Sequence, residues 1–295
     1  MTNHKPGLVR AGDLLADFNL PVVPAQTEVS KSLQKPLENL RRTIEQRAES
    51  NVIQLPLWFE HERGTPNSFL RSALFAAIES KDRKFLKEAT LASSKDVSVK
   101  YTGEQLNQED LTVWEALVHI ARREPVGNIC HFTAHGLLKS IGLHTGGAEH
   151  RRLHTTITRM IACAIEIKHD GQTYIGSLIE DAGAIDDQPT KHYAVRLNPN
   201  LIRLYGDTRW TALNWEQRRE LRRKSLAQAL HAYYSSHARP VPVKLATLRD
   251  YTGSRNTQAA DFKRKVRNAL TELKTIGFLN DFRFENDLVI VLRML

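Results

Sequence analysis

Positively charged side chains gather on one side of a helix that we expect near the end of the chain, over residues 257–276. This side combines cations with hydroxyl and amide groups, at Thr257, Gln258, Lys263, Arg264, Arg267, Thr271 and Lys274. Guanidinium, ammonium and amide groups bind phosphates and the edges of bases in DNA. Arg255, which precedes the helix, and Arg283, which follows it, add two more cations. The pattern therefore predicts a helix that binds duplex DNA.

The neighbours of this helix are typical of a winged helix. A shorter helix is predicted for residues 245–252 and stops at Gly253, because glycine commonly ends helices. In the longer helix, apolar residues recur every three or four positions and predict one buried face, made of Phe262, Val266, Ala269, Leu270, Leu273 and Ile276. Apolar runs at 278–284 and 288–292 then predict a hairpin. Helix, turn, basic helix and hairpin is the order of a winged helix, whose second helix enters the major groove.

The same plan occurs earlier in the chain, as a strand, a long helix, a short helix, a polar-faced helix and a hairpin over residues 164–179. The polar-faced helix, residues 148–163, offers a second set of DNA contacts with the hairpin, at His150, Arg151, Arg152, Thr155, Thr156, Arg159 and Lys168. A last strand, residues 192–197, is expected to follow an acidic loop that contains Asp181, Asp186 and Asp187. Two copies of this order of elements are stronger evidence for the winged-helix fold than either copy alone.

The second copy is expected to begin with a long helix near Asn214. This helix carries several cations, among them Arg218, Arg219 and Arg222. These cations either meet DNA phosphates or pair with acids of the first copy, and we favour the phosphates because positive charge is concentrated in this region. Residues 200–295 hold 18 Lys or Arg against 9 Asp or Glu, which accounts for the whole net charge of +9. A local excess of this size indicates an anionic partner.

Together these observations predict an α+β fold with two tandem winged-helix domains, residues 61–198 and 199–295, of which the second is the main DNA reader. Residues 1–60 contain several prolines and scattered apolar residues, which predicts a flexible N-terminal arm. No apolar run approaches the length of a membrane span, and the N-terminus lacks the apolar core of a signal peptide. Two cysteines cannot form a disulfide framework. We therefore expect a cytoplasmic bacterial protein without a membrane partner.

A short apolar peptide lies at the end of the arm, formed by Gln54, Leu55, Pro56, Leu57, Trp58 and Phe59. Peptides of this kind bind hydrophobic pockets of partner proteins through one or two aromatic anchors. The peptide is similar to the Gln-Leu-x-Leu-Phe motif with which bacterial proteins bind the sliding clamp of the polymerase. Here Trp58 stands where phenylalanine is usual, and Phe59 follows one position late. The alternative is that the apolar residues fold back on the first domain.

Further blocks stand in a fixed order along the chain: Arg71-Ser72-Ala73-Leu74-Phe75, Lys95-Asp96-Val97, Tyr101-Thr102-Gly103 and Tyr233-Tyr234-Ser235-Ser236-His237. With the peptide that begins at Gln54, they resemble the TrfA family of plasmid replication initiators. The resemblance covers the chain from about Gln54 to its end.

This resemblance implies a protein that binds repeated sites (iterons) at a plasmid origin and helps to open an AT-rich region. It also implies recruitment of host replication proteins, including the helicase, the host initiator and the sliding clamp, and a homodimer in equilibrium with the monomer. By analogy with other tandem winged-helix initiators, the main DNA contacts would be Arg255, Gln258, Lys263, Arg264 and Arg267. The first domain would add weaker contacts through His150, Arg151, Arg152, Thr155 and Arg159.

No enzyme motif is found along the chain, so we expect no catalytic residue, metal or cofactor. A Gly-x4-Gly-Lys-Ser/Thr phosphate loop is missing. His150 and His154 have the spacing of metal ligands on a helix but lack an obvious third ligand. Two alternatives stay open. One is a transcriptional repressor that binds DNA, and the other is a nuclease or relaxase at the origin, which would need a metal-binding cluster of acids or histidines.

Overall fold

The computed structural model describes residues 38–39, 54–123, 125, 129–187, 190–206 and 208–293. Residues 52–295 belong to one compact unit, which contains all of the described chain apart from residues 38–39. The predicted flexible arm, residues 1–60, lies outside the described residues except for 38–39 and 54–60. None of the described helices is long and apolar enough to cross a membrane.

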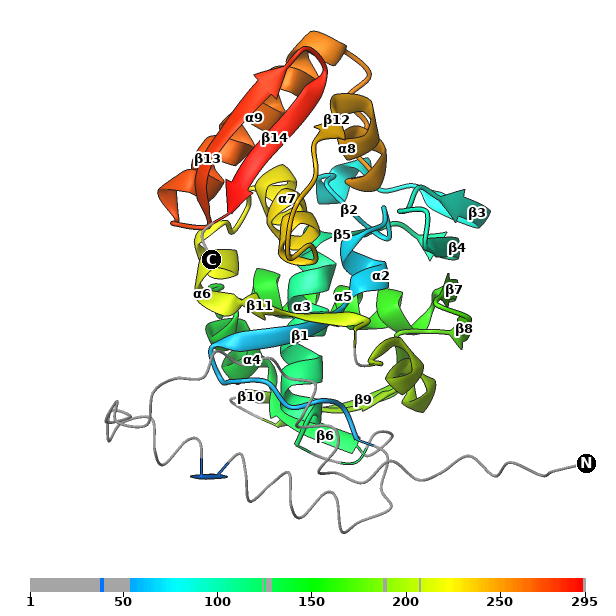
Figure 1. The fold of residues 1–295 in the computed structure, drawn as a ribbon. Helices are drawn as coiled ribbons and strands as arrows, with labels where there is room; N and C mark the ends of the chain where they lie inside the picture. The colour runs from blue at the N-terminus through cyan, green and yellow to red at the C-terminus, as the bar shows by residue number, and fades with distance from the viewer. Residues whose placement is uncertain are drawn as a thin grey trace, which may run out of the picture. The chain divides into compact units, whose positions relative to one another are not determined.

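The C-terminal elements follow one another in the order predicted from the sequence and form a unit here called the second module (residues 221–293). Its elements are α7 (Ser225–Ser235), β12 (Val243–Lys244), α8 (Leu245–Tyr251), α9 (Ala259–Thr275), β13 (Leu279–Glu285) and β14 (Leu288–Arg293). The strands form one antiparallel sheet with β14 in the middle, and the β13–β14 hairpin lies along α9 (Figure 1). The predicted apolar stripe of α9 is confirmed, since its members Phe262, Val266, Ala269, Leu270 and Leu273 are buried.

The preceding part of the chain, here called the first module (residues 54–215), repeats this arrangement. Its matching elements are α3 (Gln108–Ala121), β6 (Ile129–Thr133), α4 (Ala134–Ser140), α5 (Gly147–Ile161), β9 (Ile179–Asp187) and β10 (Thr190–Leu197). The strand order β6-β10-β9 is the same as β12-β14-β13 in the second module. The helix order α3, α4, α5 likewise corresponds to α7, α8, α9, so the repeat predicted from the sequence is present in the fold.

The hairpin that follows α5 differs from the prediction. Residues 164–179 form β7 (Ala164–His169) and β8 (Gln172–Gly176), but these join β3 (Phe85–Leu91) and β4 (Val97–Glu104) in a separate four-stranded sheet. The hairpin that matches β13–β14 is instead β9–β10. The prediction of an acidic loop was therefore wrong, because Asp181, Asp186 and Asp187 lie on β9, where pairing with β10 outweighs the low strand propensity of its alanines, glycine and aspartates.

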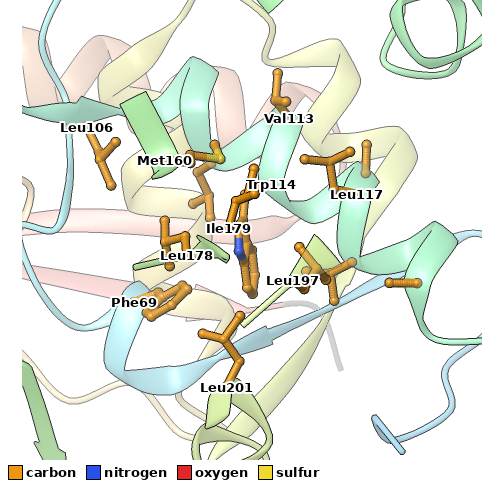
Figure 2. Close-up of a cluster of buried hydrophobic side chains, with 14 of the residues drawn as sticks. Phe69, Leu106, Val113, Trp114, Leu117, Met160, Leu178, Ile179, Leu197 and Leu201 are labelled. Carbon is orange, nitrogen blue, oxygen red and sulfur yellow. The ribbon is translucent and has the colours of Figure 1, made fainter. Parts of the chain in front are cut away.

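The division between the two modules also lies later than the predicted boundary at residues 198 and 199. Leu201, Leu204, Tyr205 and Trp215 belong to the first hydrophobic core, and the second core begins at Leu221. Figure 2 shows Leu197 and Leu201 beside Trp114, a fully buried side chain of the first core. The first module extends beyond residue 198 because β11 (Trp210–Asn214) pairs antiparallel with β1 (Glu62–Pro66) at the start of the module.

Short elements complete the first module and the link between modules. These are α2 (Asn67–Leu70), β2 (Phe75–Ala76), the 3-10 helix η2 (Ser80–Asp82), β5 (Leu106–Asn107), the 3-10 helix η3 (Pro199–Leu204) and α6 (Trp215–Glu220). The modules also touch directly, since the amide of Ala77 donates a hydrogen bond of 2.6 Å to the carbonyl of Thr252.

Gly253 fits closely against the first module at the end of α8. Its φ of +61° is in the left-handed region, and a Cβ atom there would lie 2.8 Å from the Cβ of Ala76. We expect Gly253→Ala to lower the free energy of unfolding by about 2–3 kcal/mol, because a strained backbone adds to a steric clash. Gly277→Ala is the matched control, because Gly277 has a φ of +71° but nothing within 4 Å of its Cβ position.

Chemical denaturation of both variants measures the difference between them. Backbone strain alone is expected to lower the free energy of unfolding of Gly277→Ala by about 1 kcal/mol. Equal decreases in the free energy of unfolding of the two variants would mean that the contact between Gly253 and Ala76 does not contribute to stability.

Candidate nucleic-acid interface

One side of α9 presents polar and cationic groups to solvent, as the sequence predicted. Arg264, Arg267, Thr271 and Lys274 are exposed, whereas Lys263 is half-buried. Asn268 is also exposed on this side and was missed, although its position four residues after Arg264 places it on the same face. Thr257 and Gln258 are exposed just before the first turn of the helix. The face can therefore offer hydrogen-bond donors and acceptors to a groove without rearrangement of the fold.

The β13–β14 hairpin supports two cations of this face through Phe284. The guanidinium of Arg267 lies 5.1 Å from the centre of the Phe284 ring, and the ammonium of Lys263 lies 5.5 Å from it. Lys263 also donates a hydrogen bond of 3.1 Å to the carbonyl of Asn286 at the hairpin tip. Cation–π contacts at exposed sites contribute about 0.5–1 kcal/mol each. The hairpin thus restrains Lys263 and Arg267, of which Arg267 stays exposed to solvent.

Other cations of the interface pair with local carboxylates. Arg264 and Lys265 contact Asp261, and hydrogen bonds from these two residues and from Asn256 lower the pKa of Asp261 to about 2. Lys274 pairs with Asp281 at 2.9 Å, and Arg283 pairs with Glu285 at 2.8 Å. All of these pairs are solvent-exposed, so they contribute little and DNA phosphates can replace them.

Arg255 differs from the other predicted contacts of the second module. Its side chain donates hydrogen bonds to the carbonyl of Asp82 and to the amide oxygen of Gln105, both in the first module. In this arrangement Arg255 connects the loop before α9 to the first module. A contact between Arg255 and DNA would require these bonds to break.

Two of the predicted contacts on α5 are wrong because the residues face the protein interior. Arg159 is 8% exposed and binds the Asp110 carboxylate at 2.7 Å and the Glu104 carboxylate at 2.8 Å. Thr156 is 9% exposed and donates to Asp110 at 3.2 Å. Both lie where α5 packs on α3, whose capping box holds Asp110 in place. Sequence periodicity alone gave no sign of these carboxylates.

The remaining predicted contacts of the first module are accessible to different degrees. Arg151, Arg152 and Thr155 are exposed on α5, and His150 is half-buried. Lys168 is exposed on β7, beside Glu166 at 3.1 Å. Because β7 belongs to the four-stranded sheet, Lys168 is not part of the hairpin that matches β13–β14. The first module therefore retains a smaller cationic face than predicted.

Arg218 is the clearest error among the predicted phosphate contacts. It is fully buried and pairs with the equally buried Glu115 on α3, with 2.5 Å between Nε and Oε2. Its guanidinium also donates to the backbone and side-chain oxygens of Gln108. Burial raises the pKa of Glu115 and lowers that of Arg218, and the attraction between the two opposes both shifts. Of the two readings left open for this helix, pairing with acids of the first module is correct for Arg218.

The predicted long helix after Asn214 is also interrupted. It splits into α6 and α7, with a turn in which Arg223 has a φ of +65°. Arg219, Arg222 and Arg223 are exposed, and together with Arg152 of α5 they line a cavity of about 70 Å³ between the modules. These cations are still placed to meet phosphate, but they lie at the end of α6 and not at the start of a long helix.

The clamp-like peptide packs against the first module. Leu55 and Trp58 are each only 4% exposed, whereas Phe59 is 43% exposed. Gln54 and Leu57 are half-buried. The structure thus shows the alternative in which the apolar residues fold back on the first domain, with the aromatic rings of Tyr205 and Trp210 against the indole of Trp58.

Comparison with known proteins identifies the relatives of this chain. The family model described as TrfA protein matches residues 25–293. The chain belongs to the TrfA family. The resemblance found in the sequence blocks is thereby confirmed, and membership of the TrfA family supports a role in plasmid replication initiation.

Individual relatives agree with the TrfA assignment. The chain is 28% identical to the plasmid replication initiator protein TrfA of Escherichia coli over 270 residues, which cover 89% of this chain and 70% of the relative. It is 27% identical to RepFIB replication protein A of Salmonella typhi over 195 residues, which cover 62% of this chain and 58% of the relative.

The fold is similar to that of domains 2 and 3 of RctB. A crystal structure of these domains superposes with a TM-score of 0.50 and 12% sequence identity, covering 77% of this chain and 96% of the RctB chain. A second RctB structure of the same domains also gives a TM-score of 0.50. The likeness supports the mixed helix and strand architecture with two consecutive domains.

Proposed function

We propose that this TrfA-family chain initiates plasmid replication by binding repeated duplex sites at the plasmid origin through α9. The observation that carries the proposal is the polar face of α9, on which Arg264, Arg267, Asn268 and Thr271 are all exposed. Arginine and asparagine are the side chains that most often recognise guanine and adenine in the major groove. The two modules then act as tandem winged helices, with the α5 face adding contacts to the DNA backbone.

The proposal is tested by the affinity of the full chain for duplexes that carry the origin repeats of its own plasmid, compared with scrambled duplexes, across a salt series. We expect at least a hundredfold preference for the repeats, and a linear fall of the logarithm of the binding constant with the logarithm of salt concentration. Equal affinity for both duplexes at every salt concentration would mean that the chain binds DNA without preference for the repeats, and would contradict the proposal.

We further propose that the bound chain helps to open the origin and recruits the host helicase, the host initiator and the sliding clamp. The clamp would be bound through Leu55, Leu57, Trp58 and Phe59, with Gln54 as a hydrogen-bonding group. A homodimer in equilibrium with the monomer would be the inactive form. The support for these partners is membership of the TrfA family and the sequence of the peptide.

We propose that the chain carries out these steps without a catalytic site of its own. Across the described residues, no three His, Cys, Asp or Glu side chains come together as a possible metal site. Incubation with supercoiled origin DNA and magnesium should leave the DNA intact. Nicked circles that depend on the protein would support the nuclease or relaxase alternative instead.

A further inference from the structure

The side chain of Trp58 packs against Tyr205, Trp210, His119 and Gly64 of the first module, a set of contacts here called the groove. Its indole stacks on the Tyr205 ring, with 6.3 Å between the ring centres and 13° between the planes. The Trp210 ring lies 5.8 Å away in a tilted orientation. The indole N–H donates a hydrogen bond of 3.0 Å to Nδ1 of His119 on α3. Trp58 therefore has both the packing and the polar partner that a buried tryptophan requires.

His119 connects the groove to a second contact at Glu60. Its Nε2 lies 3.1 Å from a carboxylate oxygen of Glu60, and this carboxylate also pairs with Arg122 at 2.6 Å and with Arg123. Burial lowers the pKa of His119 to about 4. The ring is then neutral at pH 7, with Nδ1 free to accept from Trp58 and Nε2–H free to donate to Glu60. Contacts on both sides of Phe59 thus hold the peptide to the module.

The floor of the groove is the backbone of Gly64 on β1. A Cβ atom at this position would lie 2.4 Å from Cε3 and 2.5 Å from Cζ3 of Trp58. These distances are far below van der Waals contact, so the indole lies directly on the glycine. Any larger residue at position 64 would displace Trp58 without changing the sequence of the peptide.

We propose that this groove and the sliding clamp compete for the same peptide, so that the chain binds the clamp only after Leu55 and Trp58 have left the groove. The inference rests on the proposed clamp binding and adds its regulation. Leu55 and Trp58 are the two residues of the peptide that are buried in the chain, and they are also two of its apolar anchors for a partner pocket. One indole cannot fill two pockets at once, so binding at one site excludes binding at the other.

The test compares three molecules on an immobilised, purified bacterial sliding clamp. These are the wild-type full chain, the full chain with Gly64→Ala, and a synthetic peptide with the sequence of residues 50–61. We expect the free peptide to bind at least fivefold more tightly than the wild-type chain. Gly64→Ala should bring the affinity of the full chain to within about twofold of that of the peptide.

Gly183→Ala is the matched control, because Gly183 lies on β9 with nothing within 4 Å of its Cβ position. It should bind the clamp as weakly as wild type does. Acrylamide quenching of tryptophan fluorescence reports release of the indole, since Trp58 is one of four tryptophans. Of the two glycine variants, only Gly64→Ala should increase the quenched fraction.

A second variant covers the case in which Gly64→Ala fails to fold. His119→Leu removes the acceptor of the Trp58 indole and the link to Glu60, and it also lies outside the peptide. We expect His119→Leu to raise the affinity of the full chain for the clamp at least twofold. Circular dichroism and a thermal melt establish that each variant is folded.

The outcomes separate the inference from the function on which it rests. A free peptide that fails to bind the clamp would reject clamp binding and the competition together. A peptide and a wild-type chain that bind equally well would leave clamp binding standing and reject the competition. An increase in quenching of Gly64→Ala without a gain in affinity would also reject it.

Discussion

Glu115→Ala is expected to lower the free energy of unfolding by about 3–5 kcal/mol, because it leaves the charge of Arg218 buried without its partner. Arg218 is 0% exposed, and its remaining hydrogen bonds, to Gln108, carry no compensating charge. The Thr65 hydroxyl, which donates to Glu115 at 3.2 Å, would lose its acceptor as well. Urea denaturation followed by circular dichroism measures the change.

Two further variants show whether the loss comes from the unpaired charge. Glu220→Ala removes an exposed glutamate from α6 and should change stability by less than about 0.5 kcal/mol. The double variant Glu115→Met with Arg218→Met should recover most of the lost stability, because well-packed apolar residues often replace a buried ion pair without cost. A double variant as unstable as Glu115→Ala would mean that the shape of the site, and not its charge balance, determines stability.

Arg264→Ala and Arg267→Ala should each weaken binding to the origin repeats at least tenfold. A bidentate arginine–guanine contact contributes about 1–3 kcal/mol of discrimination, and both side chains are exposed on α9. Arg267 should have the larger effect, because Phe284 already restrains its guanidinium and less side-chain entropy is lost on binding. Fluorescence anisotropy with labelled repeat and scrambled duplexes gives both affinities.

The scrambled duplex separates base recognition from phosphate binding. Loss of a base contact lowers affinity for the repeat more than for the scrambled duplex, whereas loss of a phosphate contact weakens both about equally. Lys87→Ala is the control, since Lys87 is exposed on β3 in the four-stranded sheet. Wild-type affinity in both arginine variants would mean that α9 does not present this face to the groove.

The second module could be predicted from the sequence because its signals are local. The stop at Gly253, the helical spacing of apolar residues on α9 and the hairpin are all signals that lie within the elements they determine or next to them. The β9–β10 hairpin was missed because β7 and β8 intervene, and because Gly183 and its neighbouring alanines are weak strand formers.

Burial of charged and aromatic candidates could not be predicted in the same way. Arg218 pairs with Glu115, and Trp58 packs on Tyr205 and Trp210, across distances in sequence that no periodicity describes. A cation on an amphipathic helix looks the same in the sequence whether phosphate or a buried carboxylate is its partner. The sequence therefore supported two readings in both places, and the tertiary fold shows a buried partner within the chain in each.

The hydrogen bond from Ala77 to Thr252 and the close fit of Gly253 against Ala76 have a consequence for the proposed binding of origin DNA. These contacts join the two modules directly, so α5 and α9, the helices proposed to bind DNA, belong to one connected body. Duplex DNA turns once in about 10.5 base pairs, so each inserted base pair rotates one half of a site against the other by roughly a tenth of a turn. On the proposed function, a repeat that engages both modules is therefore expected to keep its two halves in a constant helical phase, whatever the sequence between them.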